Sequence, residues 1–290
     1  MSPRATIRHV DAFTSRPLEG NPAAVVNGEG IDGATMQRIA LNQHLSETVF
    51  LLPPESAENH ARLRIFTPGT ELPFAGHPTV AASHILISEG RVTLGAGEAL
   101  RLETGAGLIP VAVAGEPAVY TMTQAAPQFR PYDVPLDEIA SWVGLGPGDV
   151  PRAEEVSTGL FWKIAQVGSL EAMMRVVPDM MALLRVPHGM ALFCLGANAP
   201  DAQVHVRAFA PEAGVFEDPV TGSANGCIAA FIAKHGLMEA RGGEISYVAE
   251  QGGEMGQPGR VYARATGVPG DIRAHIGGNA VTVLRGELVL

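Results

Sequence analysis

Four polar residues of this chain have side chains suited to moving a proton. Glu47 lies in the otherwise apolar stretch 46–52, and His77 stands at the start of an apolar run. Asp218 and Ser223 lie in a turn that contains proline and glycine. A carboxylate, an imidazole and a hydroxyl around a bound molecule are the parts of a general acid–base site. Burial among apolar neighbours would raise the pKa of the Glu47 carboxyl group toward a value useful for proton transfer.

Three of these residues, His77, Asp218 and Ser223, lie in two copies of one repeated sequence unit. Each copy has a strand-like segment, a polar turn with glycine and an apolar helical stretch that ends in glycine, and the copies cover 64–90 and 207–236. The strand-like segments are offset by 143 residues, and both ends of the helical stretches by 146. Two matched units with different polar residues where their helices begin predict two halves of a fold that face each other across one polar cleft.

The helical stretches that follow Gly76 and Gly222 are apolar on every side, which is typical of a buried helix. Gly90 and Gly236, at their ends, suit a left-handed C-terminal cap. We therefore expect each helix to run through the middle of a strand layer. The first N–H groups of such a helix, together with its dipole, attract a carboxylate or another anion. The two N-termini are predicted to form a cradle for a small anionic molecule.

Strand-like patterns dominate the rest of the chain. Strands are expected over residues 6–13, 23–26, 46–52, 100–104, 108–113 and 189–195. A helix is expected over 31–41, with Asp32 as its N-cap. The offset of 143 places Met190 where the first copy has Glu47, so the repeat supplies one such base rather than a mirrored pair. The proline-containing segment 127–135 is the expected linker between the halves.

The composition of the chain disfavours several classes of binding partner and cellular location. The 290 residues, 46% of them hydrophobic, suffice for two domains with sizeable cores. A formal net charge of −10, with only two lysines, leaves no basic surface for a nucleic acid. The N-terminal segment lacks a signal-peptide pattern, and no run approaches the roughly 18 apolar residues of a membrane span. Two cysteines cannot build a disulfide framework, which favours a cytoplasmic protein.

Several other chemistries are disfavoured by their motifs. The histidines show no paired helical spacing with a glutamate of the zinc-protease kind, so no metal is expected. The glycine-rich segment 144–148 contains a proline and lacks the strand and long helix of a dinucleotide site. Thr221 stands two residues before Ser223, where a serine hydrolase would have glycine.

Six short motifs follow one another along the chain, at residues 11–14, 20–22, 46–48, 66–68, 71–79 and 217–224. In combination they resemble the PhzF family of phenazine-biosynthesis-like proteins. The resemblance implies an α+β fold of the diaminopimelate-epimerase-like kind, with two pseudo-symmetric domains. Each domain would be a β-barrel-like sheet wrapped around a central helix, with the active site in the cleft between them. The expected domains are 1–126 and 127–276, and a strand within 277–290 would complete the first.

The same resemblance implies a cofactor-independent isomerase of a small carboxylated, cyclic metabolite, similar to trans-2,3-dihydro-3-hydroxyanthranilate isomerase. It also implies a homodimer. By motif match the proton-handling residues are Glu47, His77, Asp218 and Ser223. The residues expected to contact the substrate are Gly76, Thr221, Gly222 and Asn21, of which Asn21 also holds the turn beneath the cleft.

Epimerases and racemases of similar fold take and return a proton with two cysteines, one where each central helix begins. The corresponding residues here are Ala75 and Thr221. This difference disfavours a racemase that works through two thiols. A single carboxylate base fits the removal and return of a proton on one face, which gives allylic isomerisation or tautomerisation rather than stereoinversion.

Each candidate residue also has a purely structural interpretation. Glu47 could pair with an arginine, and His77 could cap a helix. Asp218 is a common turn residue, Ser223 is a common N-cap, and Cys227 is typical of core filling. Two other functions stay open: a small-molecule-binding or interaction protein without turnover, and an amino-acid racemase that uses bases other than thiols.

Overall fold

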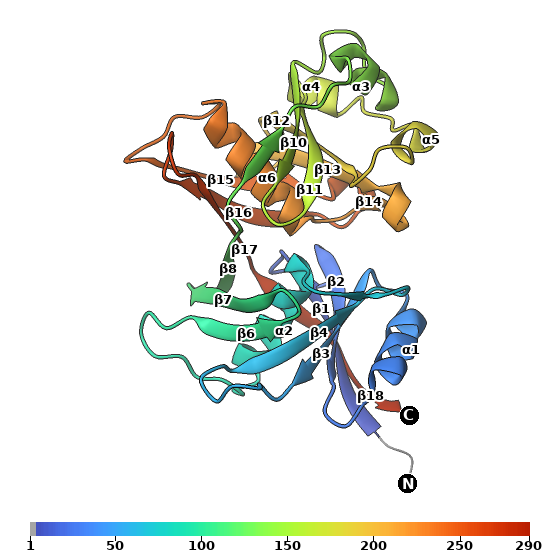
Figure 1. Cartoon of the computed structure of the whole chain (residues 1–290), viewed down its shortest axis with the longest axis vertical. Helices are drawn as coiled ribbons and strands as arrows, with labels where there is room; N and C mark the ends of the chain where they lie inside the picture. The colour runs from blue at the N-terminus through green and yellow to red at the C-terminus, as the bar shows by residue number, and fades with distance from the viewer. Residues whose placement is uncertain (1–3) are drawn as a thin grey trace. The chain divides into compact units, whose positions relative to one another are not determined.

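The computed structural model describes residues 4–290 and shows a mixed α/β protein dominated by strands (Figure 1). The chain packs into two compact units. Unit 1 contains the chain up to Met122 together with Gly277–Leu290, and unit 2 contains Thr123–Ile276. The chain passes between the units in β8 (Val119–Thr123) and β17 (Arg273–Gly278). The boundary expected from the sequence lies at residue 126.

Within residues 4–122 and 277–290, unit 1 is built from strands and two helices. Its strands, besides β8, are β1 (Arg4–Ala12), β2 (Asn21–Asn27), β3 (Glu47–Leu52), β4 (Ala61–Phe66), β5 (Glu71–Leu72), β6 (Leu100–Thr104), β7 (Gly107–Ala114) and β18 (Ala280–Val289). Its helices are α1 (Gly33–Gln43) and α2 (Gly76–Ser88). β1 pairs antiparallel with both β18 and β2, β2 runs parallel to β3, and β3 pairs antiparallel with β4. β4 then runs parallel to β6.

Helix α2 is the buried centre of unit 1 (Figure 1). It contacts β1, β2, β3, β4 and β18, and its buried residues include Val80, Ala81, Ile85 and Leu86. The prediction of a buried helix is thereby confirmed. Helix α1 packs instead against β3 and β4 with a single apolar face. Its N-cap is Asp32, as predicted, because the carboxylate accepts a hydrogen bond from the backbone N–H of Thr35 at 2.8 Å.

Unit 2 repeats this plan with additional short helices. Its strands are β9 (Gln128–Arg130), β10 (Arg152–Ser157), β11 (Phe161–Gln166), β12 (Met190–Leu195), β13 (Val204–Ala210), β14 (Val215–Asp218), β15 (Glu244–Gln251) and β16 (Gly259–Thr266). Its helices are α3 (Leu136–Trp142), α4 (Leu170–Met173), α5 (Met180–Leu183) and α6 (Gly222–Lys234), with short 3₁₀ turns at η1 (Pro211–Ala213) and η2 (Gly253–Met255). The buried α6 contacts β10, β11 and β16. Helices α3, α4 and α5 pack around a second apolar cluster that includes Ile139, Met173 and Leu183.

The strand connections of unit 2 follow the same order as those of unit 1. β11 runs parallel to β12, β12 antiparallel to β13, and β13 parallel to β15. Helices α2 and α6 are both 13 residues long. Gly90 and Gly236, just beyond their ends, have φ values of +67° and +59°, in the left-handed region predicted for a C-terminal glycine. The sequence repeat is thus a repeat of structure.

The segment 127–135, expected as a linker, lies inside unit 2 and contains β9. β9 pairs antiparallel with β10, and Phe129 is opposite Val156. The three-residue strand is assigned because β10 offers it a hydrogen-bonding partner, which its local composition does not reveal.

Candidate functional site

Glu47 begins β3 and lies opposite Ala23 of the parallel strand β2. Its side chain is only 17% exposed. Burial raises the pKa of the Glu47 carboxyl group above its ordinary value, and a hydrogen bond from the Ser46 side chain opposes this only in part. A carboxyl group of this kind can hold a proton at a higher pH than a surface glutamate can, which suits a group that takes up and gives back a proton.

His77, the second residue of α2, lies beside this carboxyl group. Its Nε2 is 3.2 Å from Oε2 of Glu47 and 3.5 Å from Oγ of Ser46. The first distance is short enough for an ion pair, yet Oε2 is buried and accepts no hydrogen bond from any residue in 4–290. The lack of such a bond agrees with a carboxyl pKa that is governed by burial. The structure therefore brings together two of the predicted proton-handling residues, both in unit 1.

An arginine partner for Glu47, the structural alternative, is not found among the described residues. Arg64, on the neighbouring strand β4, instead pairs with Glu71 through two hydrogen bonds of 2.7 Å. Unit 2 has the matching pair, Arg207 with Glu217, with hydrogen bonds of 2.8 and 2.9 Å. Each of these arginines belongs to the repeated scaffold and forms its ion pair with its own glutamate. Oε2 of Glu47 is therefore left buried and without a hydrogen bond from an arginine.

The substrate-contact candidates of unit 1 lie at the start of α2 and in β2. Gly76 is the first residue of α2, and its N-cap is Ala75, which has no side chain that can cap the helix. Asn21 is the first residue of β2, is 1% exposed and lies opposite Ala12 of β1. It follows Gly20, where φ is +71° and an added Cβ would lie 2.3 Å from the Ala12 carbonyl oxygen. A residue with a Cβ would clash there, so the turn before Asn21 requires glycine at position 20.

The candidates of unit 2 lie where α6 begins. Asp218 ends β14, Thr221 is the N-cap of α6 and Gly222 is its first residue. The Thr221 hydroxyl donates a hydrogen bond of 2.6 Å to Oδ2 of Asp218. Gln251, from the end of β15, bonds to both residues. The turn between β14 and α6 is therefore fixed by side chains as well as by the helix.

Ser223 is the second residue of α6 rather than its N-cap, so the interpretation of Ser223 as a capping residue is wrong. The extended backbone of Thr221 starts the helix two residues earlier. Oγ of Ser223 accepts a hydrogen bond of 3.1 Å from the indole N–H of Trp162, a residue of β11. Because the indole nitrogen is only a donor, this bond leaves the Ser223 hydroxyl hydrogen available to donate elsewhere.

Both cysteines are buried, and neither stands where a central helix begins. Burial raises the thiol pKa of Cys194 and of Cys227 to about 12 in each case. Cys227 packs inside α6 and donates to the Val156 carbonyl oxygen at 3.3 Å, as expected of a core residue. Neither thiol can supply a thiolate base near neutral pH. The N-cap positions that thiols would occupy hold Ala75 and Thr221.

Three neighbours of the candidate residues were not predicted as site residues from the sequence. Ser46 contacts His77, Trp162 contacts Ser223, and Gln251 holds the turn of Asp218. Gln251 and Trp162 come from strands distant in the chain, and glutamine and tryptophan in strands are ordinary. Only the tertiary structure identifies them.

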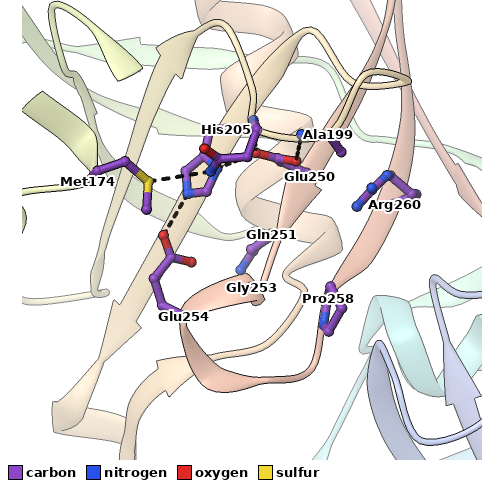
Figure 2. A pocket seen from close by; sticks show the side chains of 10 residues that line it. Met174, Ala199, His205, Glu250, Gln251, Gly253, Glu254, Pro258 and Arg260 are labelled. Atoms are coloured by element: carbon purple, nitrogen blue, oxygen red, sulfur yellow. Dashed lines mark hydrogen bonds and ion pairs between the residues drawn. The ribbon is translucent and has the colours of Figure 1, made fainter. Parts of the chain in front are cut away.

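The pocket drawn in Figure 2 lies within unit 2 and has a volume of about 460 Å³. Its lining includes His205, Glu250, Gln251, Glu254 and Arg260 but none of the four predicted proton-handling residues. Gln251 is the lining residue that also bonds to the Asp218 turn. Across residues 4–290, no cluster of three or more His, Cys, Asp or Glu side chains is arranged to hold a metal ion, and no helix is both long and apolar enough to cross a membrane.

Solved structures with the same architecture identify the fold. A hydroxyproline epimerase from Agrobacterium vitis superposes with a TM-score of 0.66 at 15% identity, covering 99% of this chain and 93% of that one. A PhzF-family phenazine biosynthesis protein from Bacillus anthracis superposes with a TM-score of 0.91 at 31% identity, covering 99% and 100%. The chain has the two-domain epimerase-like fold that the sequence predicted.

Sequence comparisons identify the family to which the chain belongs among proteins with this fold. The family model described as phenazine biosynthesis-like protein matches residues 10–286. Trans-2,3-dihydro-3-hydroxyanthranilate isomerase from Pseudomonas aeruginosa is 35% identical over 286 residues, which cover 97% of this chain and 98% of that protein. The uncharacterized isomerase YfhB of Bacillus subtilis is 34% identical over 289 residues, which cover 96% of each chain. The chain belongs to the PhzC–PhzF family and is an isomerase.

Proposed function

We propose that this protein is a cofactor-independent isomerase of a small, carboxylated, cyclic metabolite and that Glu47 is the group that moves the proton. The observation that carries this proposal is the buried Oε2 atom of Glu47, which accepts no hydrogen bond from the described part of the chain and lies 3.2 Å from Nε2 of His77. A buried carboxyl group with a raised pKa is expensive to maintain and is typical of a functional site.

In the proposed reaction, the Glu47 carboxylate removes a proton from one carbon of the substrate and returns it to another carbon on the same face. The carbon–carbon double bond shifts as the proton moves, and no electron is gained or lost overall. His77, with Nε2 3.2 Å from Oε2, would stabilise Glu47 when it is the ionised carboxylate. One base suffices because the proton stays on one face. The absence of a second glutamate at Met190, the corresponding position in unit 2, fits this mechanism.

For unit 2 we propose Asp218 and Ser223 as further proton-handling residues, and we propose Gly76, Thr221, Gly222 and Asn21 as substrate-contact residues. The N-termini of α2 and α6 each offer backbone N–H groups and the positive end of a helix dipole, which favour a carboxylate. The relatives named trans-2,3-dihydro-3-hydroxyanthranilate isomerase support an amino-hydroxy carboxylic acid of this kind as the substrate class. A cytoplasmic homodimer is part of the same proposal.

A racemase that works through two thiols is disfavoured by the two cysteines. Both are buried, and the pKa of each thiol is raised to about 12. The likeness to hydroxyproline epimerase, at 15% identity, concerns the fold alone. A racemase with other bases would require a second base, and the position that matches Glu47 in unit 2 holds the apolar, buried Met190.

The test is incorporation of deuterium from D₂O into trans-2,3-dihydro-3-hydroxyanthranilate, followed by NMR together with formation of the isomer. Wild-type protein should catalyse both. Glu47→Gln should lower both rates by at least about 100-fold, since general acid–base catalysis contributes about 10²–10⁴-fold. Glu58→Gln is the matched control, because Glu58 is an exposed glutamate of the same unit.

Equal rates for Glu47→Gln and Glu58→Gln would refute the assignment of the base. Binding of the compound without isomerisation or exchange, in the wild-type protein, would favour the binding-protein alternative. Loss of optical rotation of an amino acid, without a double-bond shift, would favour a racemase.

A further inference from the structure

Gln251 lies behind the turn that carries Asp218. It is the last residue of β15, is 1% exposed, and its strand is paired on both sides, with Val206 of β13 and Gly259 of β16. Its side-chain amide makes four hydrogen bonds. Oε1 accepts from Thr221 N at 3.1 Å and Asn225 Nδ2 at 3.0 Å, and Nε2 donates to Asp218 O at 2.9 Å and Thr221 Oγ1 at 3.0 Å.

Two of these partners are backbone groups, and they settle which end of the amide is which. The N–H of Thr221 can only donate, so it must face Oε1 of Gln251. The carbonyl oxygen of Asp218 can only accept, so it must face Nε2. A rotated amide would place two donors together at one end and two acceptors at the other. These two backbone groups therefore allow only one orientation of the Gln251 side-chain amide.

This orientation determines where the Thr221 hydroxyl proton points. Oγ1 of Thr221 accepts a hydrogen bond from Nε2 of Gln251, so its own hydrogen is directed to Oδ2 of Asp218, 2.6 Å away. Gln251 thus acts on Asp218 twice: directly through the backbone carbonyl, and through the Thr221 hydroxyl on the carboxylate. All four hydrogen-bonding positions of the buried amide are used, which makes the arrangement rigid.

The chain on either side of Gln251 is held as firmly. Gly252 has φ of +84°, and an added Cβ would lie 2.5 Å from the Pro219 carbonyl oxygen and 2.4 Å from that of Gln257, so the strand end packs closely against the turn. Figure 2 shows His205 between Glu250 and Glu254, which flank Gln251 in sequence. Nδ1 of His205 lies 2.6 Å from Glu250, and Nε2 lies 2.9 Å from Glu254.

We infer that Gln251 is a positioning residue for the isomerisation: it fixes the turn between β14 and α6 and directs the Thr221 hydroxyl proton onto the Asp218 carboxylate. The inference rests on the proposed function, because it assumes that Asp218 acts on the substrate. Positioning of this kind affects the rate strongly, since a displacement of about 1 Å of a reacting group can cost about 100-fold.

Gln251→Glu separates the role of the side-chain amide as a hydrogen-bond acceptor from its role as a donor. The substituted side chain keeps an acceptor for the Thr221 N–H and loses the donors to Asp218 and to the Thr221 hydroxyl. We expect kcat for trans-2,3-dihydro-3-hydroxyanthranilate to fall about 100-fold, while the Thr221 amide stays protected from hydrogen exchange. Gln251→Met removes all four hydrogen bonds and should also make the Thr221 amide exchange faster.

Gln203→Glu is the matched control for the loss of a glutamine. The Gln203 side chain also accepts from a backbone N–H, that of Val248 at 2.8 Å, but makes no bond to the turn. The Gln203→Glu variant should leave kcat unchanged. Thr221→Val provides a second route, because it removes only the hydroxyl that links Gln251 to Asp218. If the two residues act in series, the double variant Gln251→Glu with Thr221→Val should be little slower than the slower single variant.

A kcat of Gln251→Glu equal to that of wild type would overturn the inference, as would additive losses in the double variant. Equal falls in kcat and in thermal stability for Gln251→Glu and Gln203→Glu would point to a structural role alone. Inactivity of the wild-type protein itself would instead refute the proposed function and, with it, this role of Gln251.

Discussion

Replacement of Glu47 by glutamine should stabilise the folded protein at alkaline pH, even though it should lower activity by at least about 100-fold. Burial raises the pKa of the Glu47 carboxyl group, and its Oε2 atom accepts no hydrogen bond within residues 4–290. The folded state therefore favours the protonated form. The stability contributed by this form is fully present below the unfolded pKa of about 4.5 and is lost as pH rises through the higher folded pKa.

The size of the effect follows from the environment of the carboxylate. Each unit by which the folded pKa exceeds the unfolded one costs about 1.4 kcal/mol once the group is ionised. A neutral glutamine still leaves a buried polar group, which costs about 1–3 kcal/mol if unpaired, whereas an ionised carboxylate costs more. We expect Glu47→Gln to raise the free energy of unfolding at pH 8 by about 1.4 kcal/mol for each unit by which the folded pKa of Glu47 exceeds the unfolded one. At pH 4 the two proteins should be nearly equally stable.

Urea denaturation at pH 4, 6 and 8 measures this difference. Wild type, Glu47→Gln and the exposed control Glu58→Gln should be compared at the same ionic strength, so that the loss of one charge is matched. The gain from Glu47→Gln should grow with pH, and that from Glu58→Gln should stay near zero. A destabilised Glu47→Gln at pH 8 would refute the reasoning, because it would mean that His77 stabilises the Glu47 carboxylate by more than burial costs.

Two further predictions concern buried groups elsewhere in the chain. Burial disfavours the charged form of His205, but the hydrogen bonds that it donates to Glu254 and Glu250, together with the attraction of their charges, outweigh burial and raise the pKa of His205. Burial is also the largest single influence on each glutamate, but the hydrogen bond from His205, backbone hydrogen bonds and nearby positive charge together outweigh it and lower the pKa of Glu250 and of Glu254. The stabilisation should be complete between about pH 4.5 and 6.5, fading as pH rises through the His205 pKa or falls through those of the glutamates. Urea titrations of His205→Gln should lack this alkaline loss, and an identical pH profile in the variant would contradict the assignment. Cys194 and Cys227 should resist iodoacetamide at pH 8 until the protein is unfolded, since burial raises the pKa of each thiol to about 12. Rapid labelling of native protein, detected by mass spectrometry, would show that this burial is incomplete.

Much of the scaffold could be predicted because its signals are local. The apolar runs after Gly76 and Gly222 can only be buried helices, and the equal offset of their ends predicted the equal lengths that α2 and α6 have. Asp32 was predicted as an N-cap because the bond it makes is to a residue three positions later. Such features depend on a few consecutive residues, and the fold does not override them.

Other features depend on partners far away in the sequence. β9 is a strand only because β10 pairs with it, so residues 127–135 looked like a linker. Helices α4 and α5, four residues each, are too short to give a periodic signal, and they are held by packing against the apolar cluster of unit 2. Serine is a common N-cap residue, but α6 begins at Gly222 with Thr221 as its N-cap, so Ser223 lies inside the helix.

The amino-acid sequence by itself determined the repeat, the two buried helices, the family and which residue types stand where those helices begin. Apolar periodicity and spacing encode the repeat and the helices, and short local motifs carry the resemblance to the family. Only the tertiary structure decided that Glu47 keeps a buried oxygen beside His77, that Trp162 bonds to Ser223, and that Gln251 orients the turn of Asp218. Hydrogen-bond partners and burial are set by which strands come to lie side by side, and no spacing in the sequence records that.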